Sequence, residues 1–181
     1  MANERGKCAG LVEEQARDRI EDIRLLLVPT KEDVELVDRG TMDTCIRLGD
    51  IEEVYSQEHA ADYRDEDGTL DLESFVDDHW DELAERARER WYEFGLGFDY
   101  VDREDTEHFW RYQISWGGPS EEIRFFANHD LTLYRAEFWY MDWFDGAHVV
   151  VTDDDTVRAI WDEFVETETA AHARDKVLND G

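Results

Sequence analysis

The spacing of apolar residues changes once along this chain, at about residue 96, and that change limits the folds it can adopt. Before it, apolar side chains recur every three to four residues, whereas after it they alternate with polar ones. Strand-like stretches then follow at 96–102, 109–116, 121–128, 131–143 and 148–152. Because the short turns between them can join only antiparallel neighbours, we predict an antiparallel meander sheet of about four to five strands.

Helical spacing outside these strands predicts three amphipathic helices. They cover residues 10–27, residues 72–94 and about residues 156–172. Asp71 is expected to cap the second helix, and Gly95 to end it. Three consecutive aspartates precede the third helix, where negative charge favours a helix N-terminus.

A further short helix is predicted after residue 30, because Thr30 and Asp33 have the spacing of a capping box and Gly40 is a stop signal. Residues 41–60 fit no single pattern. The sequence therefore predicts one α+β domain, with helices covering one face of the sheet. Its expected parts are a mainly helical acidic part (1–94), the antiparallel sheet (95–152) and a C-terminal helix (153–181).

The chain is strongly acidic, with 48 Asp and Glu against 19 Lys and Arg and a formal net charge of -29. Direct binding to nucleic acid or to an anionic membrane is disfavoured, because both require clustered Lys and Arg. Seven Trp residues indicate a folded chain rather than a disordered one. We therefore expect basic surfaces as partners, and the same acidity would also suit a high-salt cytoplasm.

The absence of several sequence motifs limits the cellular compartment and the chemistry that we expect for this protein. Without a secretory signal or a run of about 18 apolar residues, the protein is expected to be cytoplasmic. Cys8 and Cys45 are expected to be free thiols. The six histidines have no metal-ligand spacing, and no nucleophile motif occurs. We therefore expect no cofactor, no metal site, no catalytic residue and no enzymatic activity.

Two short stretches suggest ligand sites, but each has a simpler explanation. Gly117-Gly118-Pro119 lies between two predicted strands rather than before a helix, so we interpret it as a hairpin corner and not a phosphate loop. Asp65, Asp67 and Gly68 match three positions of a calcium-binding loop. However, the first and twelfth positions lack ligands, so an acidic turn is preferred to a loose divalent-cation site.

The charge is concentrated between residues 50 and 82, which hold fourteen acidic side chains and one basic one, Arg64. A globule of this mass exposes about 9,000 Å², so the net charge averages about one per 300 Å², roughly a third of the density of duplex DNA. Imitation of DNA would thus require the acidic side chains to be concentrated on one face of the protein. Our leading hypothesis is a non-enzymatic inhibitor whose carboxylates occupy the basic groove of a nucleic-acid-binding complex. The residues expected to replace phosphates are Asp62, Asp65, Glu66, Asp67, Asp77, Asp78, Asp81 and Glu82.

The alternative hypothesis is a salt-adapted cytosolic binding or scaffold module that works through the predicted sheet. Alternation places Trp110, Tyr112, Ile114 and Trp116 on one face of a strand, and Arg111, Gln113 and Ser115 on the other. This second face could bind a carboxylate or an acidic loop, or it could hold ordinary cross-strand ion pairs. Its candidate residues are Arg111, Arg124, Arg135, Glu137 and Trp139. An enzyme using Arg111, Arg124 and Glu137 would also need a concave site.

Three segments, WYEFGLGFDYVD, FWRYQISWGGPSEEIRFFAN and YRAEFWYMDWFDGA, resemble small uncharacterised acidic proteins carried on plasmids and other mobile elements of bacteria and archaea. The likeness covers about residues 91–147, under a third of the chain, and leaves out residues 50–82. The resemblance implies a mobile-element setting, in which small acidic proteins often inhibit restriction, CRISPR or other defence complexes. It carries over no catalytic residue.

Overall fold

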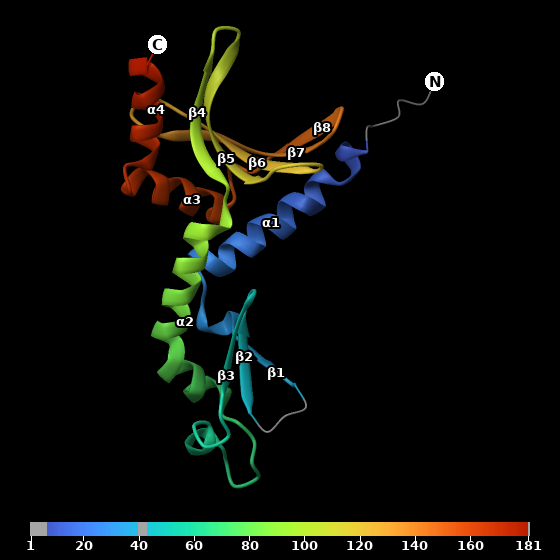
Figure 1. The fold of residues 1–181 in the computed structure, drawn as a ribbon, viewed down its shortest axis with the longest axis vertical. Helices are drawn as coiled ribbons and strands as arrows, with labels where there is room; N and C mark the ends of the chain where they lie inside the picture. Colours follow the sequence, from blue (N-terminus) through green and yellow to red (C-terminus); the bar gives the residue numbers. More distant parts are fainter. Residues whose placement is uncertain (1–6, 40–42, 181) are drawn as a thin grey trace. The chain divides into compact units, whose positions relative to one another are not determined.

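A computed structural model of the chain describes residues 7–39 and 43–180 (Figure 1). The fold is α+β, as predicted. It contains the predicted antiparallel sheet, with five strands, and a second antiparallel sheet of three strands that the sequence did not predict. The chain forms two compact units, which are described separately. We call Met1–Glu21 with Glu93–Gly181 the five-stranded unit, and Asp22–Tyr92 the three-stranded unit. None of the described helices is both long and apolar enough to cross a membrane.

The helices are α1 (Val12–Leu27), α2 (Leu72–Phe94), α3 (Asp155–Glu166) and α4 (Thr169–Asp180). The first sheet contains β1 (Glu35–Val37), β2 (Thr44–Leu48) and β3 (Ile51–Tyr55). The second contains β4 (Gly97–Arg103), β5 (Thr106–Ser115), β6 (Ser120–Ala127), β7 (Leu133–Asp142) and β8 (Asp145–Val150). Short 3-10 helices occur at Cys8–Gly10, Lys31–Asp33 and Ala61–Tyr63.

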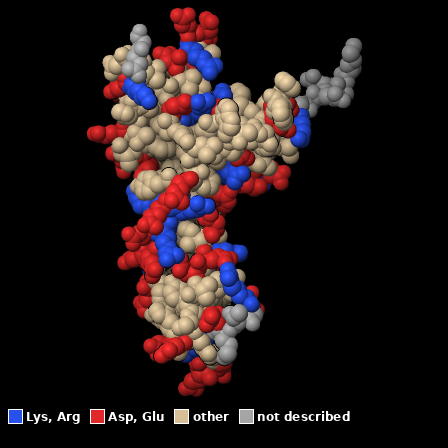
Figure 2. Space-filling view, viewed as in Figure 1, with Lys and Arg blue, Asp and Glu red and all other residues tan. Residues whose placement is uncertain are grey.

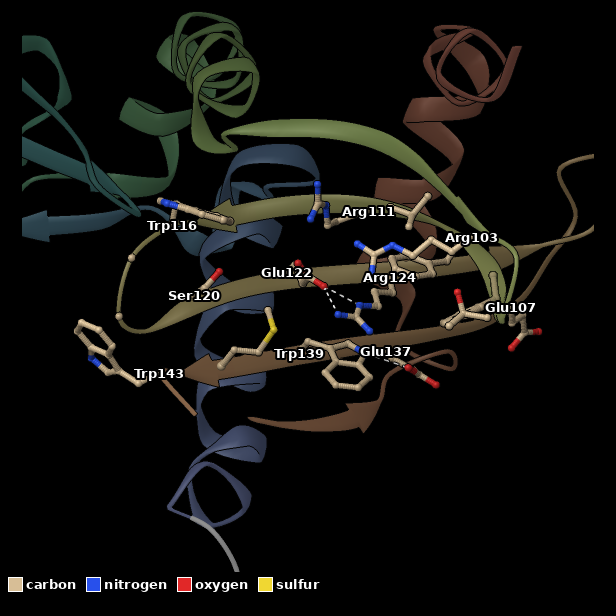
Figure 3. Close-up of a pocket in the computed structure, with 17 residues that line it drawn as sticks. Arg103, Glu107, Arg111, Trp116, Ser120, Glu122, Arg124, Glu137, Trp139 and Trp143 are labelled. Atoms are coloured by element: carbon tan, nitrogen blue, oxygen red, sulfur yellow. Dashed lines mark hydrogen bonds and ion pairs between the residues drawn. The ribbon is translucent and has the colours of Figure 1, made fainter. Parts of the chain in front are cut away.

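In the five-stranded unit, consecutive strands pair with one another in the order β4-β5-β6-β7-β8, so the sheet is the predicted meander. Strand alternation sends Trp110, Tyr112 and Ile114 of β5 to one face, and all three are buried. We call this the covered face, because α1, α3 and α4 lie against it (Figures 1 and 3). The opposite face, called the open face below, carries the polar side chains of the same strands.

Aromatic packing joins the covered face to the C-terminal helices. The ring of Trp161 in α3 lies 5.2 Å from Trp110 and 5.4 Å from Phe125, and the Trp110 indole donates a hydrogen bond to the Ala170 carbonyl at 2.8 Å. Such contacts bury large areas and also satisfy the indole N–H. They fix which face of the sheet is covered.

The three-stranded unit has its own core. Its central strand β2 is nearly all buried, and Ile46 and Leu48 pack with Phe75, Val76 and Leu83 of α2. Asp71 caps α2 as predicted, because its carboxylate accepts hydrogen bonds from the Ser74 backbone N–H and hydroxyl. The predicted bounds of this helix, 72–94, are also those observed.

Two of the helix predictions are wrong in detail. Thr30 and Asp33 do form a capping box, but it begins only the 3-10 turn Lys31–Asp33, after which β1 starts at Glu35. Gly40, the predicted stop, lies outside the described residues. The C-terminal helix is two helices, because Glu168 adopts a φ of 59° and interrupts the helix between α3 and α4.

One side chain also lies where the alternation did not place it. Trp116 was predicted to share the face of Trp110, but β5 ends at Ser115 and Trp116 belongs to the turn that follows. There it is 77% exposed. Gly117-Gly118-Pro119 completes this turn between β5 and β6, which is the hairpin corner that the sequence predicted.

We expect the ion pair of Asp33 and Arg24 to make the stability of the protein depend on pH. Arg24 donates two hydrogen bonds to Asp33, at 2.6 and 2.9 Å, and these contacts lower the pKa of Asp33 from 3.8 to about 2. Because the pKa is lowered on folding, the stabilisation is complete above about pH 4 and is lost as the pH falls towards 2. Asp33→Asn should lower the free energy of unfolding by about 1 to 2 kcal/mol at pH 7, after allowance for solvent screening, in urea titrations.

Glu35→Gln provides the control, since the Glu35–Arg47 pair is exposed and should contribute less than about 0.5 kcal/mol. A difference between wild type and Asp33→Asn that persisted unchanged at pH 2.5 would contradict this prediction.

Candidate functional site: a groove on the open sheet face

A groove of about 780 Å³ runs along the open face of the five-stranded sheet. Residues of β4, β5, β6 and β7 form its floor, and the turns after β5 and β7 form one end (Figure 3). The volume lies within the range of ordinary ligand sites, about 300 to 1,000 Å³. The groove is therefore the concave site that the sequence could not show.

Arg124 lies at the centre of the floor. Its Nε and Nη2 atoms both lie 2.6 Å from Oε1 of Glu122, whose side chain is only 4% exposed. The same guanidinium lies over the Trp139 ring, 3.8 Å from its centroid, and 4.8 Å from that of Phe109. Arg124 is thus held by charge on one side and by aromatic faces on two others.

Arg135 repeats this arrangement nearer to the other end. Its guanidinium lies 3.8 Å from the Phe126 ring centroid and forms an ion pair with Glu107. The Arg135 Nε atom also lies 3.0 Å from Glu137, outside hydrogen-bond geometry, while Glu137 accepts a hydrogen bond from the Trp139 indole at 2.9 Å. Charged and aromatic side chains therefore alternate across the strands.

A third arginine stands next to the first. Arg111 lies directly opposite Arg124 in the sheet register, an unfavourable position for two like charges. Each has its own carboxylate, since Arg111 donates hydrogen bonds of 2.9 and 2.6 Å to Asp99 on β4. Neutralisation by a separate partner is what lets both cations occupy adjacent positions.

For two of these groups, the contacts favour the ionised form. Hydrogen bonds from Arg135 and then Tyr134 hold the pKa of Glu107 below its ordinary value, and the contact with Asp99 raises the pKa of Arg111. Arg103, Arg111 and Arg124 line the groove together with Glu107, Glu122 and Glu137, so its lining has no formal net charge. That neutrality contrasts with the excess of acidic over basic residues in both units, part of which is visible as separate acidic side chains in Figure 2.

Two tryptophans form one end of the groove. Trp116 is 77% exposed and Trp143 is 87% exposed, and Figure 3 shows both beyond the last polar contacts. Their turns are adjacent, because a Cβ added to Gly118 would lie 3.0 Å from the Trp143 indole nitrogen. Phe144, next in the chain, is fully exposed. Large apolar groups exposed together are typical of interaction sites.

The structure brings the predicted sheet-face residues together. Arg111, Arg124, Glu137 and Trp139 line the groove, and Arg135 lies beside them on the same face. Three further residues of the groove, Glu122, Trp116 and Trp143, were not among the candidate site residues predicted from the sequence. The available signal for Glu122 was its position two residues before Arg124 on one predicted strand, because residues two apart lie on the same face of a sheet. Trp143 was predicted to end the strand 131–143, but β7 ends at Asp142 and Trp143 lies in the turn before β8. The available signal there was the apolar pair Trp143 and Phe144 between two aspartates.

The predicted acidic residues all belong to the three-stranded unit, and all eight are exposed. Some have local structural contacts: Asp65 accepts hydrogen bonds from two backbone N–H groups of its own loop, Asp77 pairs with Lys31, and Asp78 accepts one from Tyr63. Asp65 thus forms the acidic turn preferred above.

Two histidines also meet in this unit, although they are far apart in sequence. The Nε2 atoms of His59 and His79 lie 2.8 Å apart, and Nδ1 of His79 lies 2.7 Å from the Phe75 carbonyl. Within residues 7–39 and 43–180, no three His, Cys, Asp or Glu side chains are placed to hold a metal ion.

Comparison with protein families, with curated proteins and with solved structures finds no match to this chain.

We expect the Glu122–Arg124 pair to contribute more to stability than its neighbour Asp99–Arg111. Glu122→Gln leaves a partly buried guanidinium without its counter-charge and should lower the free energy of unfolding by about 2 kcal/mol. Glu122→Gln with Arg124→Met should cost less than the sum of the two single changes, giving a coupling above about 1 kcal/mol in a double-mutant cycle.

The matched cycle on Asp99 and Arg111, whose side chains are 50% and 30% exposed, should give a coupling below about 1 kcal/mol. Equal coupling in the two cycles would show that burial of Glu122 does not set the strength of the central pair.

Proposed function

We propose that this protein is a non-enzymatic binding protein whose working surface is the groove on the open face of the five-stranded sheet. The observation that carries the proposal is the combination of an ordered Arg–aromatic floor with exposed indoles at one end. Rigid aromatic and arginine side chains are the groups most enriched at the energetic centres of protein interfaces. The groove thus has the side chains of a recognition surface already fixed in place.

The same contacts favour binding over catalysis. The three glutamates that line the groove contact arginine or tryptophan side chains of the floor. For Glu107, the contact with Arg135 also stabilises the ionised form. A general acid near neutral pH would instead need a raised pKa. This arrangement suits a fixed surface that presents donors, acceptors and aromatic faces to a partner.

The seven tryptophans provide a direct test, because they report on both units. Protein labelled with 5-fluorotryptophan would be titrated with three pools of random hexapeptides, basic, neutral and acidic, while fluorine NMR follows each residue. We expect at least one pool to shift the signals of Trp116, Trp139 and Trp143, which line the groove. Trp80 and Trp91 belong to the three-stranded unit and should remain unchanged.

Signals would be assigned with single Trp→Phe variants. If no pool shifted any groove tryptophan at millimolar peptide, the groove would not be the working surface.

A second candidate function is the nucleic-acid mimic, and one feature of α2 favours it. Leu72–Glu85 carries six acidic residues and no basic one, over about 21 Å of helix. That is about one carboxylate per 3.5 Å, close to the phosphate spacing along one DNA strand, about 3.4 Å. At 100° per residue the six lie within about half of the circumference, opposite the buried residues. They are Glu73, Asp77, Asp78, Asp81, Glu82 and Glu85, all exposed.

Average charge density does not support mimicry by itself. Spread over 11646 Å² of accessible surface, the net charge is about one per 400 Å², a quarter of the density of duplex DNA. The six acidic residues of α2 would therefore have to imitate DNA as a local patch of high charge density. Together with the resemblance to mobile-element proteins, it would make the protein an inhibitor of a basic nucleic-acid-binding complex.

This candidate predicts that the arrangement of charge matters more than its amount. Asp77, Asp78, Asp81 and Glu82 changed together to Lys should weaken, at least tenfold, the ability to displace labelled 20-base-pair DNA from a panel of basic DNA-binding proteins. The control changes the exposed Glu13, Glu14, Asp162 and Glu166 to Lys, which gives the same net charge. Equal weakening in both variants, measured by fluorescence anisotropy, would reduce the effect to net charge and rule out mimicry.

A further inference from the structure

We infer that the groove binds a cationic segment of a partner protein, with an arginine or lysine of that segment lying over Trp116 or Trp143. This inference rests on the proposed function and names the chemistry of the partner. It depends on how cations and aromatic rings alternate along the groove, on the field around it, and on the backbone of Trp143.

The aromatic rings inside the groove already have cations over them. Arg124 lies over Trp139 and near Phe109, and Arg135 lies over Phe126. At the end of the groove the pattern stops: Trp116 and Trp143 are exposed, and no lysine or arginine among the described residues lies over either ring. A guanidinium or ammonium group from a partner would continue the series at these two positions.

Electrostatics favour a cation at this end over an anion. The groove lining has no formal net charge, because it contains three arginines and three glutamates, so it holds no surplus of positive charge for a phosphate or a carboxylate. The five-stranded unit as a whole has 26 acidic and 11 basic residues. A field of this sign attracts basic segments at long range and repels nucleic acid.

The backbone at Trp143 indicates that its exposed position has a role. Trp143 and Phe144 form the two-residue turn between the paired residues Asp142 and Asp145, and Trp143 has a φ of 53°. Two-residue hairpin turns favour glycine or asparagine where φ is positive, and a bulky side chain there is strained. An 87% exposed indole gains little from packing in return. Strain without a packing gain is typical of functional positions.

The groove also fits a short extended segment. From Ser120 to Phe126, which both line it, β6 extends about 20 Å at 3.3 Å per residue. An extended peptide of about six residues spans the same length.

The test compares hexapeptides that differ only in charge. Fluorescein-labelled pools with Arg and Lys at alternate positions, with Gln at the same positions, or with Glu, would be titrated with the whole protein and followed by anisotropy. We expect the basic pool to bind at least tenfold more tightly than the neutral pool. Affinity should fall about tenfold between 0.1 and 1 M NaCl, because both the steering field and the contact are electrostatic.

Variants of Trp143 separate the groove contact from general attraction to an acidic protein. Trp143→Gly leaves the net charge unchanged and relieves the positive φ, so it should keep wild-type stability while binding of the basic pool falls about tenfold. Trp143→Leu, which is apolar but has no aromatic face, should lose as much. Trp143→Phe should retain affinity within about threefold.

The outcomes separate the two proposals. Binding of the neutral or acidic pool that depends on Trp143 would overturn the cationic partner and leave the groove as the working surface. Basic peptides that bind wild type, Trp143→Gly and Trp116→Ala equally would overturn the inference as well, because attraction would then be general. If no pool bound in a way that depended on Trp116 or Trp143, both the inference and the proposed function would fail.

Discussion

The structure of the groove depends on the contact between Arg124 and Glu122. This contact holds a guanidinium group over the aromatic rings of the open face, so that the face can be both aromatic and stable in water. Helices bury one face of the sheet, and the other face carries the rings of Phe109, Phe126 and Trp139. A flat apolar face of this kind tends to associate with other molecules. Here guanidinium groups cover the aromatic rings, and their carboxylates hold them in position. The face is thereby kept polar and ordered without a covering helix.

The net charge of the groove lining differs from that of the rest of the protein, and this difference bears on why the protein is acidic. Acidic side chains predominate in both units, yet the groove lining balances three arginines against three glutamates. Salt adaptation explains a solvated acidic exterior but gives no reason for cation–aromatic stacking on one sheet face. The proposed recognition surface inside an acidic protein would explain both features, because the exterior would attract a basic partner at long range and the groove would bind it at contact.

Local patterns predicted those parts of the fold in which one periodicity dominates. The alternation around Arg111 correctly put Trp110 and Tyr112 on the face opposite Arg111, although it did not predict which face the helices cover. Asp71 and Gly95 bracket the second helix as expected. Prediction failed where tertiary contacts decide. The capping box at Thr30 starts a helical turn, but pairing of Glu35 with Arg47 across β1 and β2 then makes the chain extended. No short-range signal identifies such a partner.

The candidate site was predictable only in part, and the reason is physical. Parity placed Arg111, Arg124 and Glu137 on one face, because alternation is a local property of strands. Trp116 and Trp143 escaped this argument, since each leaves its strand at a turn and parity no longer applies there. In Trp143 an aromatic residue occupies a position where the backbone favours glycine, so local sequence preference and structure disagree. Such disagreements concentrate at functional positions, and here one falls where the series of stacked arginines ends and a partner's cation would begin.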